Sequence, residues 1–165
     1  STMPSMKIWG IEGKRLRSYL SPEMQAAVET ALATKDLSSP EYLAAQDEYY
    51  RRHVISLDPM PHDVVYSFEN ASDVYTIMQG QCEFDVSGRL RDWDSTDELH
   101  RIGVPVLLVS GNDDESTPLI NKTMYDRIPD CRWELIPHGT HLVNAEFPEQ
   151  YNAVVEKFLE NVERR

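Results

Sequence analysis

Several features that mark other classes of protein are scarce or missing in this sequence of 165 residues. Its two cysteines, Cys82 and Cys131, lie in dissimilar surroundings and form neither a Cys-x-x-Cys motif nor a cysteine-dense framework. No apolar run reaches the roughly 18 residues that cross a bilayer, and the N-terminus has no basic segment followed by an apolar one. We therefore expect a soluble, cytoplasmic protein with reduced thiols and no membrane partner.

Positive charge is also scarce. Sixteen Lys and Arg residues stand against 28 Asp and Glu residues, which gives a net charge of −12 and a pI near 4.7. Binding to nucleic acid relies on basic side chains that displace counterions from phosphates, so nucleic acid is not an expected partner. The hydrophobic fraction of 41% and the charged fraction of 27% are typical of a globular chain, and we expect this one to fold.

Strand-like alternation of apolar and polar residues is absent up to about residue 90, and helical signals take its place. Ser21-Pro22 and Ser39-Pro40 each put a capping serine before a proline at the first helical position. A further helical stretch runs from about Ala71 to Met78, while the prolines of residues 58–61 (DPMP) interrupt the pattern. We expect residues 1–90 to be mostly helical.

The pattern of apolar residues changes in residues 91–165, where strand-like segments alternate with helical ones. The apolar run Val104–Ser110 is typical of a strand buried on both faces of a parallel sheet, and Arg132–Ile136 predicts a second strand. Thr117-Pro118 predicts a helix through Ile128, and a final helix from Pro148 carries an apolar stripe. The fold class is therefore α/β, with two terminal parallel strands and their helices. Two strands alone leave both edges open, so we expect either that residues 1–90 contain further strands or that part of the sheet lies outside this chain.

Two loops that follow these strands carry candidate catalytic side chains, because ligands of open α/β sheets bind at the carboxyl ends of the strands. Acidic residues after the first strand precede a histidine after the second, with 27 positions between Asp114 and His141. This is the order of the last two members of a Ser-Asp-His triad in an α/β hydrolase. Residue types alone leave a plainer interpretation open, in which the acidic turn only caps the helix at Thr117.

The nucleophile that such a triad requires is missing. No Gly-x-Ser-x-Gly motif occurs, since Ser110 and Ser87 have Leu108 and Asp85 two positions before them, and there is no Gly-Gly pair of the oxyanion-hole type. His138 and His141 form a His-x-x-His pair without a third ligand at fixed spacing. We expect no metal and no cofactor.

A set of motifs runs nearly end to end: YYRRHV (49–54) with LDP (57–59), VYTIMQG (74–80), CEF (82–84), DWD (92–94), GNDDESTP (111–118), and GTH (139–141) with EFPE (146–149). Together they resemble the C-terminal portion of the proline iminopeptidase (prolyl aminopeptidase) family of α/β hydrolases. The resemblance implies that residues 1–90 are a helical cap and residues 91–165 the C-terminal portion of the hydrolase core. It also implies that Asp114, rather than the neighbouring Asp113, is the triad acid and that His141 is the general base.

The resemblance further implies how a substrate is held. Glu83 in the cap and Glu115, directly after the triad acid, match two glutamates that bind a free amino terminus, and Tyr75 matches a tyrosine that lines the same pocket. Two glutamates also make physical sense, because an ammonium that enters a closed pocket loses its hydration and needs opposite charges in place of the water.

We therefore expect the cap and C-terminal core of a serine aminopeptidase that releases an N-terminal residue, preferentially proline, from small peptides through an acyl-enzyme. An N-terminal α/β-hydrolase portion outside this chain would supply the serine and the oxyanion hole, and the isolated chain would be inactive. Two alternatives stay open. One is an amidase or esterase of the same fold that acts on small amino-acid derivatives, and the other is a non-catalytic, truncated homologue that serves as an interaction module.

Overall fold

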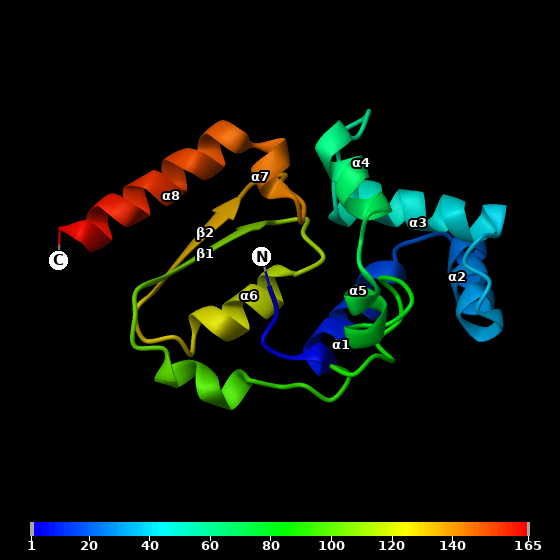
Figure 1. The fold of residues 1–165 in the computed structure, drawn as a ribbon, viewed down its shortest axis with the longest axis horizontal. Helices are drawn as coiled ribbons and strands as arrows, with labels where there is room; N and C mark the ends of the chain where they lie inside the picture. The colour runs from blue at the N-terminus through cyan, green and yellow to red at the C-terminus, as the bar shows by residue number, and fades with distance from the viewer. Residues whose placement is uncertain (1, 165) are drawn as a thin grey trace.

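The computed structural model describes residues 2–164, in which a group of helices, α1 to α5, lies to one side of a small parallel sheet (Figure 1). The elements follow in this order: α1 (Met6–Arg17), α2 (Pro22–Thr34), α3 (Pro40–His53), α4 (His62–Glu69), α5 (Asp73–Met78), the 3-10 helix η1 (Thr96–Arg101), β1 (Val106–Gly111), α6 (Pro118–Tyr125), β2 (Cys131–Ile136), α7 (Val143–Glu146) and α8 (Pro148–Glu163). No helix in residues 2–164 is both long enough and apolar enough to cross a bilayer.

Helices α2 and α3 begin at the two Ser-Pro pairs, as the sequence predicts. Ser21 Oγ accepts a hydrogen bond from the backbone N–H of Met24, and Ser39 Oγ accepts one from that of Tyr42, both at 3.3 Å. Proline is well suited to the first helical position, because its missing N–H would have no partner inside the helix there. The two helices pack around one cluster of buried side chains: Val28, Ala31, Tyr42, Ala45 and Cys82.

Helices α1 and α4 have no such signal in the sequence. No side chain among the described residues caps the first turn of either helix, and α1 contains Gly10 and Gly13, each of which weakens a helix by about 1 kcal/mol relative to alanine. Packing compensates in α1, where Met6 and Trp9 form a buried cluster with Ile120 of α6. Tertiary contacts therefore determine this helix.

The sheet is the predicted parallel pair. Val106 of β1 lies opposite Cys131 of β2, and the register continues to the last residue of each strand. Strand β1 begins two residues later than the apolar run suggests, because Pro105 has no N–H to donate to a neighbouring strand. The first hydrogen bond between the two strand segments runs from the Val106 N–H to the Asp130 carbonyl at 2.8 Å. Helices α6 and α8 lie on opposite sides of the strands (Figure 1). Helix α6 ends at Tyr125, three residues earlier than predicted.

The apolar stripe of α8 is only partly covered. The helix begins at Pro148 as predicted, but none of its described residues is buried, and Leu159 is 51% exposed. The stripe borders a groove of about 430 Å³ that also contacts β1 and His141. Within residues 2–164, β1 pairs with β2 alone, so its other edge is open along this groove.

Contacts on α1 join the helical region to the strand region. The Met6 N–H donates to the Trp93 carbonyl at 3.0 Å. Glu12 is buried in α1, and its carboxylate accepts a hydrogen bond from the Thr117 hydroxyl at 2.6 Å and pairs with Arg15 at 2.7 Å. These interactions fix α1 against the start of α6, next to the loop that follows β1.

Candidate active site

Two loops at the carboxyl ends of the strands build the site. We call residues 112–117, after β1, the acid loop, and residues 137–142, after β2, the histidine loop. The Asp113 N–H donates to the Gly139 carbonyl at 3.0 Å, which joins the two loops. A Cβ on Gly111 would lie 1.8 Å from the Gly139 carbonyl oxygen, so only glycine allows the backbones to come this close.

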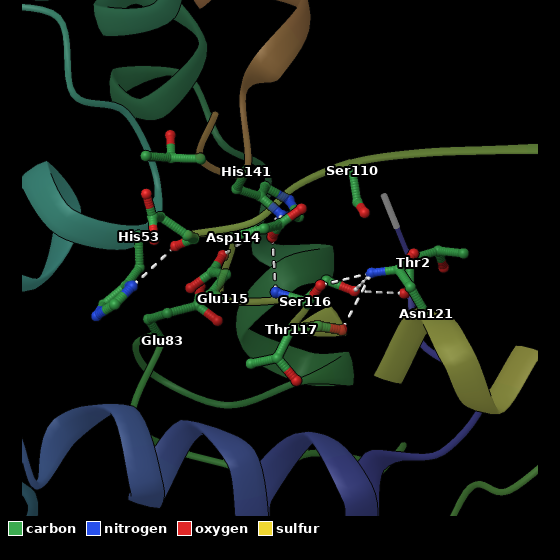
Figure 2. A network of polar contacts seen from close by, with 12 residues as sticks. Thr2, His53, Glu83, Ser110, Asp114, Glu115, Ser116, Thr117, Asn121 and His141 are labelled. Atoms are coloured by element: carbon green, nitrogen blue, oxygen red, sulfur yellow. Dashed lines mark hydrogen bonds and ion pairs between the residues drawn. The ribbon is translucent and has the colours of Figure 1, made fainter. Parts of the chain in front are cut away.

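The structure brings Asp114 and His141 into direct contact. Nδ1 of His141 donates to Oδ1 of Asp114 at 2.9 Å, and the same oxygen accepts the N–H of Ser116 at 2.6 Å (Figure 2). The Asp114 side chain is fully buried, whereas that of His141 is 26% exposed. Because a carboxylate can only accept, the imidazole carries its proton on Nδ1, and Nε2 is the nitrogen that can take up a proton.

Asp113, the competing candidate for the acid, lies at an exposed position. Its carboxylate accepts a hydrogen bond from the Asn112 side chain at 3.4 Å, and its carbonyl accepts one from His53 Nδ1 at 2.8 Å. His53 ends α3, and burial lowers the pKa of its imidazole. Of the two neighbouring aspartates, Asp114 is therefore the one whose carboxylate contacts the imidazole of His141.

Glu115 is a buried carboxylate beside this pair. Its Oε1 lies 4.0 Å from Nδ1 of His141, and its Oε2 has no hydrogen-bond partner among the described residues. Burial raises the pKa of Glu115 well above its usual value, and the nearby charges of Glu83 and Asp114 raise it further. A buried carboxylate with an unused oxygen is a suitable partner for a cation.

Glu83 and Tyr75 complete an acidic pocket with Glu115. The Tyr75 hydroxyl donates to Glu83 Oε2 at 2.7 Å, and Gln79 donates to Glu83 Oε1 at 3.1 Å. Burial and the charge of Glu83 raise the pKa of Tyr75, so the hydroxyl stays protonated as a donor. Figure 2 shows the carboxylates of Glu83 and Glu115 turned toward each other. Gln79 was not a candidate from the sequence, although its spacing of four residues from both Tyr75 and Glu83 could have indicated it.

A cavity of about 250 Å³ lies beside Glu83, between α1 and the segment 83–86. The rings of Tyr49 and Phe84 meet edge to face in its wall, with ring centroids 4.9 Å apart. Its lining consists of Trp9, Gly10, Gly13, Lys14, Arg17, Tyr49, Glu83, Phe84 and Val86. The wall combines aromatic and aliphatic side chains with one carboxylate, that of Glu83, and two basic side chains, those of Lys14 and Arg17.

Ser110 and Ser87, which the sequence offers without a nucleophile motif around them, both hydrogen-bond to other side chains. Ser110 is fully buried in β1, where its Oγ accepts a hydrogen bond from the Trp133 indole at 3.0 Å. The Ser87 hydroxyl donates to Asp85 at 2.9 Å. No cluster of three or more His, Cys, Asp or Glu side chains in residues 2–164 is arranged to hold a metal ion.

Two features define the class of protein to which this chain belongs. It has parallel strands with helices on both faces, and it has an acid and a histidine at the carboxyl ends of those strands. The chain has the fold of the C-terminal portion of an α/β hydrolase. No protein-family model matches it. Over nearly its whole length it is similar to the C-terminal portion of proline iminopeptidases.

Three relatives illustrate this similarity. The proline iminopeptidase of Lactobacillus acidophilus is 33% identical over 161 residues, which cover 97% of this chain and 55% of that protein. The crystal structure of a proline iminopeptidase from Mycobacterium smegmatis superposes with a TM-score of 0.85 at 38% identity, covering 96% of this chain and 54% of that one. The crystal structure of VinJ gives a TM-score of 0.92 at 37% identity, with coverages of 97% and 55%. The chain thus spans about half the length of the curated relatives it matches.

Proposed function

We propose that this chain is the cap and C-terminal core of a serine aminopeptidase that releases an N-terminal residue, preferentially proline, from peptides. In this proposal residues 1–90 are the cap and residues 91–165 the core portion. The observation that carries it is the acidic pocket of Glu83, Glu115 and Tyr75 next to the hydrogen-bonded pair of Asp114 and His141. The similarity to proline iminopeptidases supports the same assignment.

The acidic pocket suits the amino terminus of a peptide. An ammonium placed between Glu83 and Glu115 would offset the repulsion of the two carboxylates and would give Glu115 Oε2 a partner that it lacks among residues 2–164. Removing one partner of such a buried ionic contact costs about 3–5 kcal/mol, which is roughly two to three and a half orders of magnitude in binding. The cavity beside Glu83 offers space for a small ring such as that of proline.

The pair of Asp114 and His141 fits the chemistry of an acyl-enzyme. A serine from the N-terminal portion would attack the scissile carbonyl while His141 Nε2 takes its proton, and Asp114 would hold the ring and stabilise the imidazolium. The protonated His141 would then give that proton to the leaving amine. In the second half, His141 would take a proton from the attacking water and return it to the serine as the acyl bond breaks.

The open edge of β1 and the apolar stripe of α8 indicate where that N-terminal portion would bind. The groove between them is lined mostly by apolar side chains, including Leu107, Val155 and Phe158. A further parallel strand along β1 would satisfy its unpaired backbone groups and cover this surface. The isolated chain would then lack the nucleophile and would be inactive.

The test is to mix the chain with its native N-terminal α/β-hydrolase portion and to assay cleavage of a proline arylamide. We expect activity in the mixture only, and its loss in the variant His141→Ala. A pair that binds tightly but stays inactive, or whose activity does not depend on His141, would refute the proposal. The first of these outcomes would favour the alternative of a non-catalytic interaction module.

A further inference from the structure

Glu146, at the end of α7, has an unusual number of hydrogen bonds for a half-buried carboxylate. Its Oε1 accepts from the N–H and the hydroxyl of Ser56, both at 2.6 Å, and from the Thr140 hydroxyl at 2.8 Å. Its Oε2 accepts from the Thr140 N–H at 2.7 Å. The carboxylate therefore joins the segment after α3 to the residue directly before His141.

The backbone of the segment after α3 holds the same loop from its other side. We call residues 53–56 the strap. The His53 carbonyl accepts the N–H of Glu115 at 3.2 Å and the N–H of His141 at 3.1 Å, and the Val54 carbonyl accepts the N–H of Leu142 at 2.9 Å. The histidine loop is thus tied to the strap directly at His141 and Leu142, and through Glu146 at Thr140, while the acid loop is tied to it at Glu115.

We propose that Glu146 is a positioning residue for His141, and that it makes the position of His141 depend on the strap through Ser56. The inference rests on the proposed function, in which His141 is the general base. Hydrogen bonds to an ionised carboxylate are shorter and stronger than those between neutral groups, and here four of them converge on one side chain. They fix the backbone at Thr140 so that the neighbouring imidazole stays within 2.9 Å of Asp114.

A purely structural role would have different consequences. If Glu146 only stabilised the short helix α7, its loss would lower the folded fraction, and activity would fall in proportion. If it positions His141, its loss will lower kcat in enzyme that is fully folded. KM will change little, because Glu146 touches neither the acidic pocket nor the cavity beside Glu83.

The test compares two variants of the chain completed by its N-terminal portion. Glu146→Gln keeps the shape but offers only one accepting oxygen, so either the Thr140 N–H or the Ser56 donors lose their acceptor. Glu149→Gln, at an exposed position in the first turn of α8, removes the same charge and is the matched control. We expect kcat for a proline arylamide to fall by about 10- to 100-fold in Glu146→Gln, because small displacements of a catalytic group have effects of this order. In Glu149→Gln it stays at the wild-type value.

Two further measurements separate the possible outcomes. Ser56→Ala should lower kcat less than Glu146→Gln does, and Ser56→Thr, which keeps the hydroxyl, should restore it. Exchange of the Thr140 and His141 amides with deuterium, measured by NMR in this chain, should be faster in Glu146→Gln than in Glu149→Gln. Equal kcat in the two glutamate variants, or a fall in kcat that only follows a lower melting temperature, would overturn the proposal. If the wild-type pair is itself inactive, the proposed function fails, and the exchange rates alone decide on the role of Glu146.

Discussion

At the scale of single residues, Glu115 couples the site to pH. Its pKa is raised in the folded chain, so the folded state binds the proton more tightly than the unfolded state does. The stability that this residue contributes is therefore fully present at low pH and is lost as pH rises above the ordinary glutamate value toward the raised one.

Glu115→Gln should remove this dependence. We expect the variant to gain stability relative to the wild type as pH increases from about 5 to about 8, because the amide carries no charge to bury. Urea unfolding of both proteins at several pH values measures the difference directly, and other titrating groups such as His53 cancel in the comparison. Stability curves that run parallel across this range would show that Glu115 keeps an ordinary pKa.

Gly111 sets the distance between the two loops at the same scale. In Gly111→Ala the new methyl group would meet the Gly139 carbonyl at 1.8 Å, so one loop must move. We expect a loss of about 1–3 kcal/mol in unfolding free energy, which is the usual cost of overpacking, together with weaker activity of the completed enzyme. Gly103→Ala is the control, since a Cβ there meets no described atom within 4 Å. Thermal unfolding measures both losses, and an equal loss of unfolding free energy in the two variants would contradict the role of Gly111.

At the scale of elements, the helices and strands that depend on signals within their own segment could be predicted from the sequence. Features that depend on contacts between distant residues could not. The capping serines predicted α2 and α3, and the apolar runs predicted β1, β2 and α8, because these signals lie within each segment. The order of an acid and a histidine after successive strands predicted that an acidic side chain would meet His141, and the resemblance to proline iminopeptidases selected Asp114 over Asp113. Glu146 lies in the EFPE motif, but its contact with Ser56 could not be predicted, since Ser56 is 90 positions away in the sequence and the contact exists only in the fold. Helix α1 depends on packing against α6 in the same way.

Helix α8 offers a test of the groove. We expect Leu159→Asp, on the exposed stripe, to change the stability of the isolated chain by no more than about 0.5 kcal/mol, as is usual for a surface position. The same substitution should weaken binding of the N-terminal portion, because it puts a charge on the surface to be covered. Ala153→Asp, on the opposite face of α8, should leave that binding unchanged. Isothermal titration of the two variants decides the matter, and equal affinities would remove α8 from the binding surface.

At the scale of the whole molecule, the open edge of β1 and the partly covered stripe of α8 lead us to expect that stability depends on a partner. We expect the melting temperature of the chain to rise when its N-terminal portion is added, by an amount that grows with the concentration of that portion. At a hundredfold excess over Kd the gain is about 2.7 kcal/mol. A dye that fluoresces on apolar surfaces should bind the isolated chain and be displaced by the partner. A melting temperature that does not respond to the partner would contradict this.

We propose that the acidic pocket beside Asp114 and His141, in which Glu115 is buried and Glu83 is half-buried, selects a free amino group. This selection is tested most directly by comparing kcat/KM of the completed enzyme for a proline arylamide and for its N-acetylated form. We predict that the wild type prefers the free amine by roughly two to three and a half orders of magnitude, and that Glu115→Gln and Glu83→Gln lose most of this preference. Equal rates for the free and the acetylated substrate in the wild type would contradict the account and would favour an amidase or esterase.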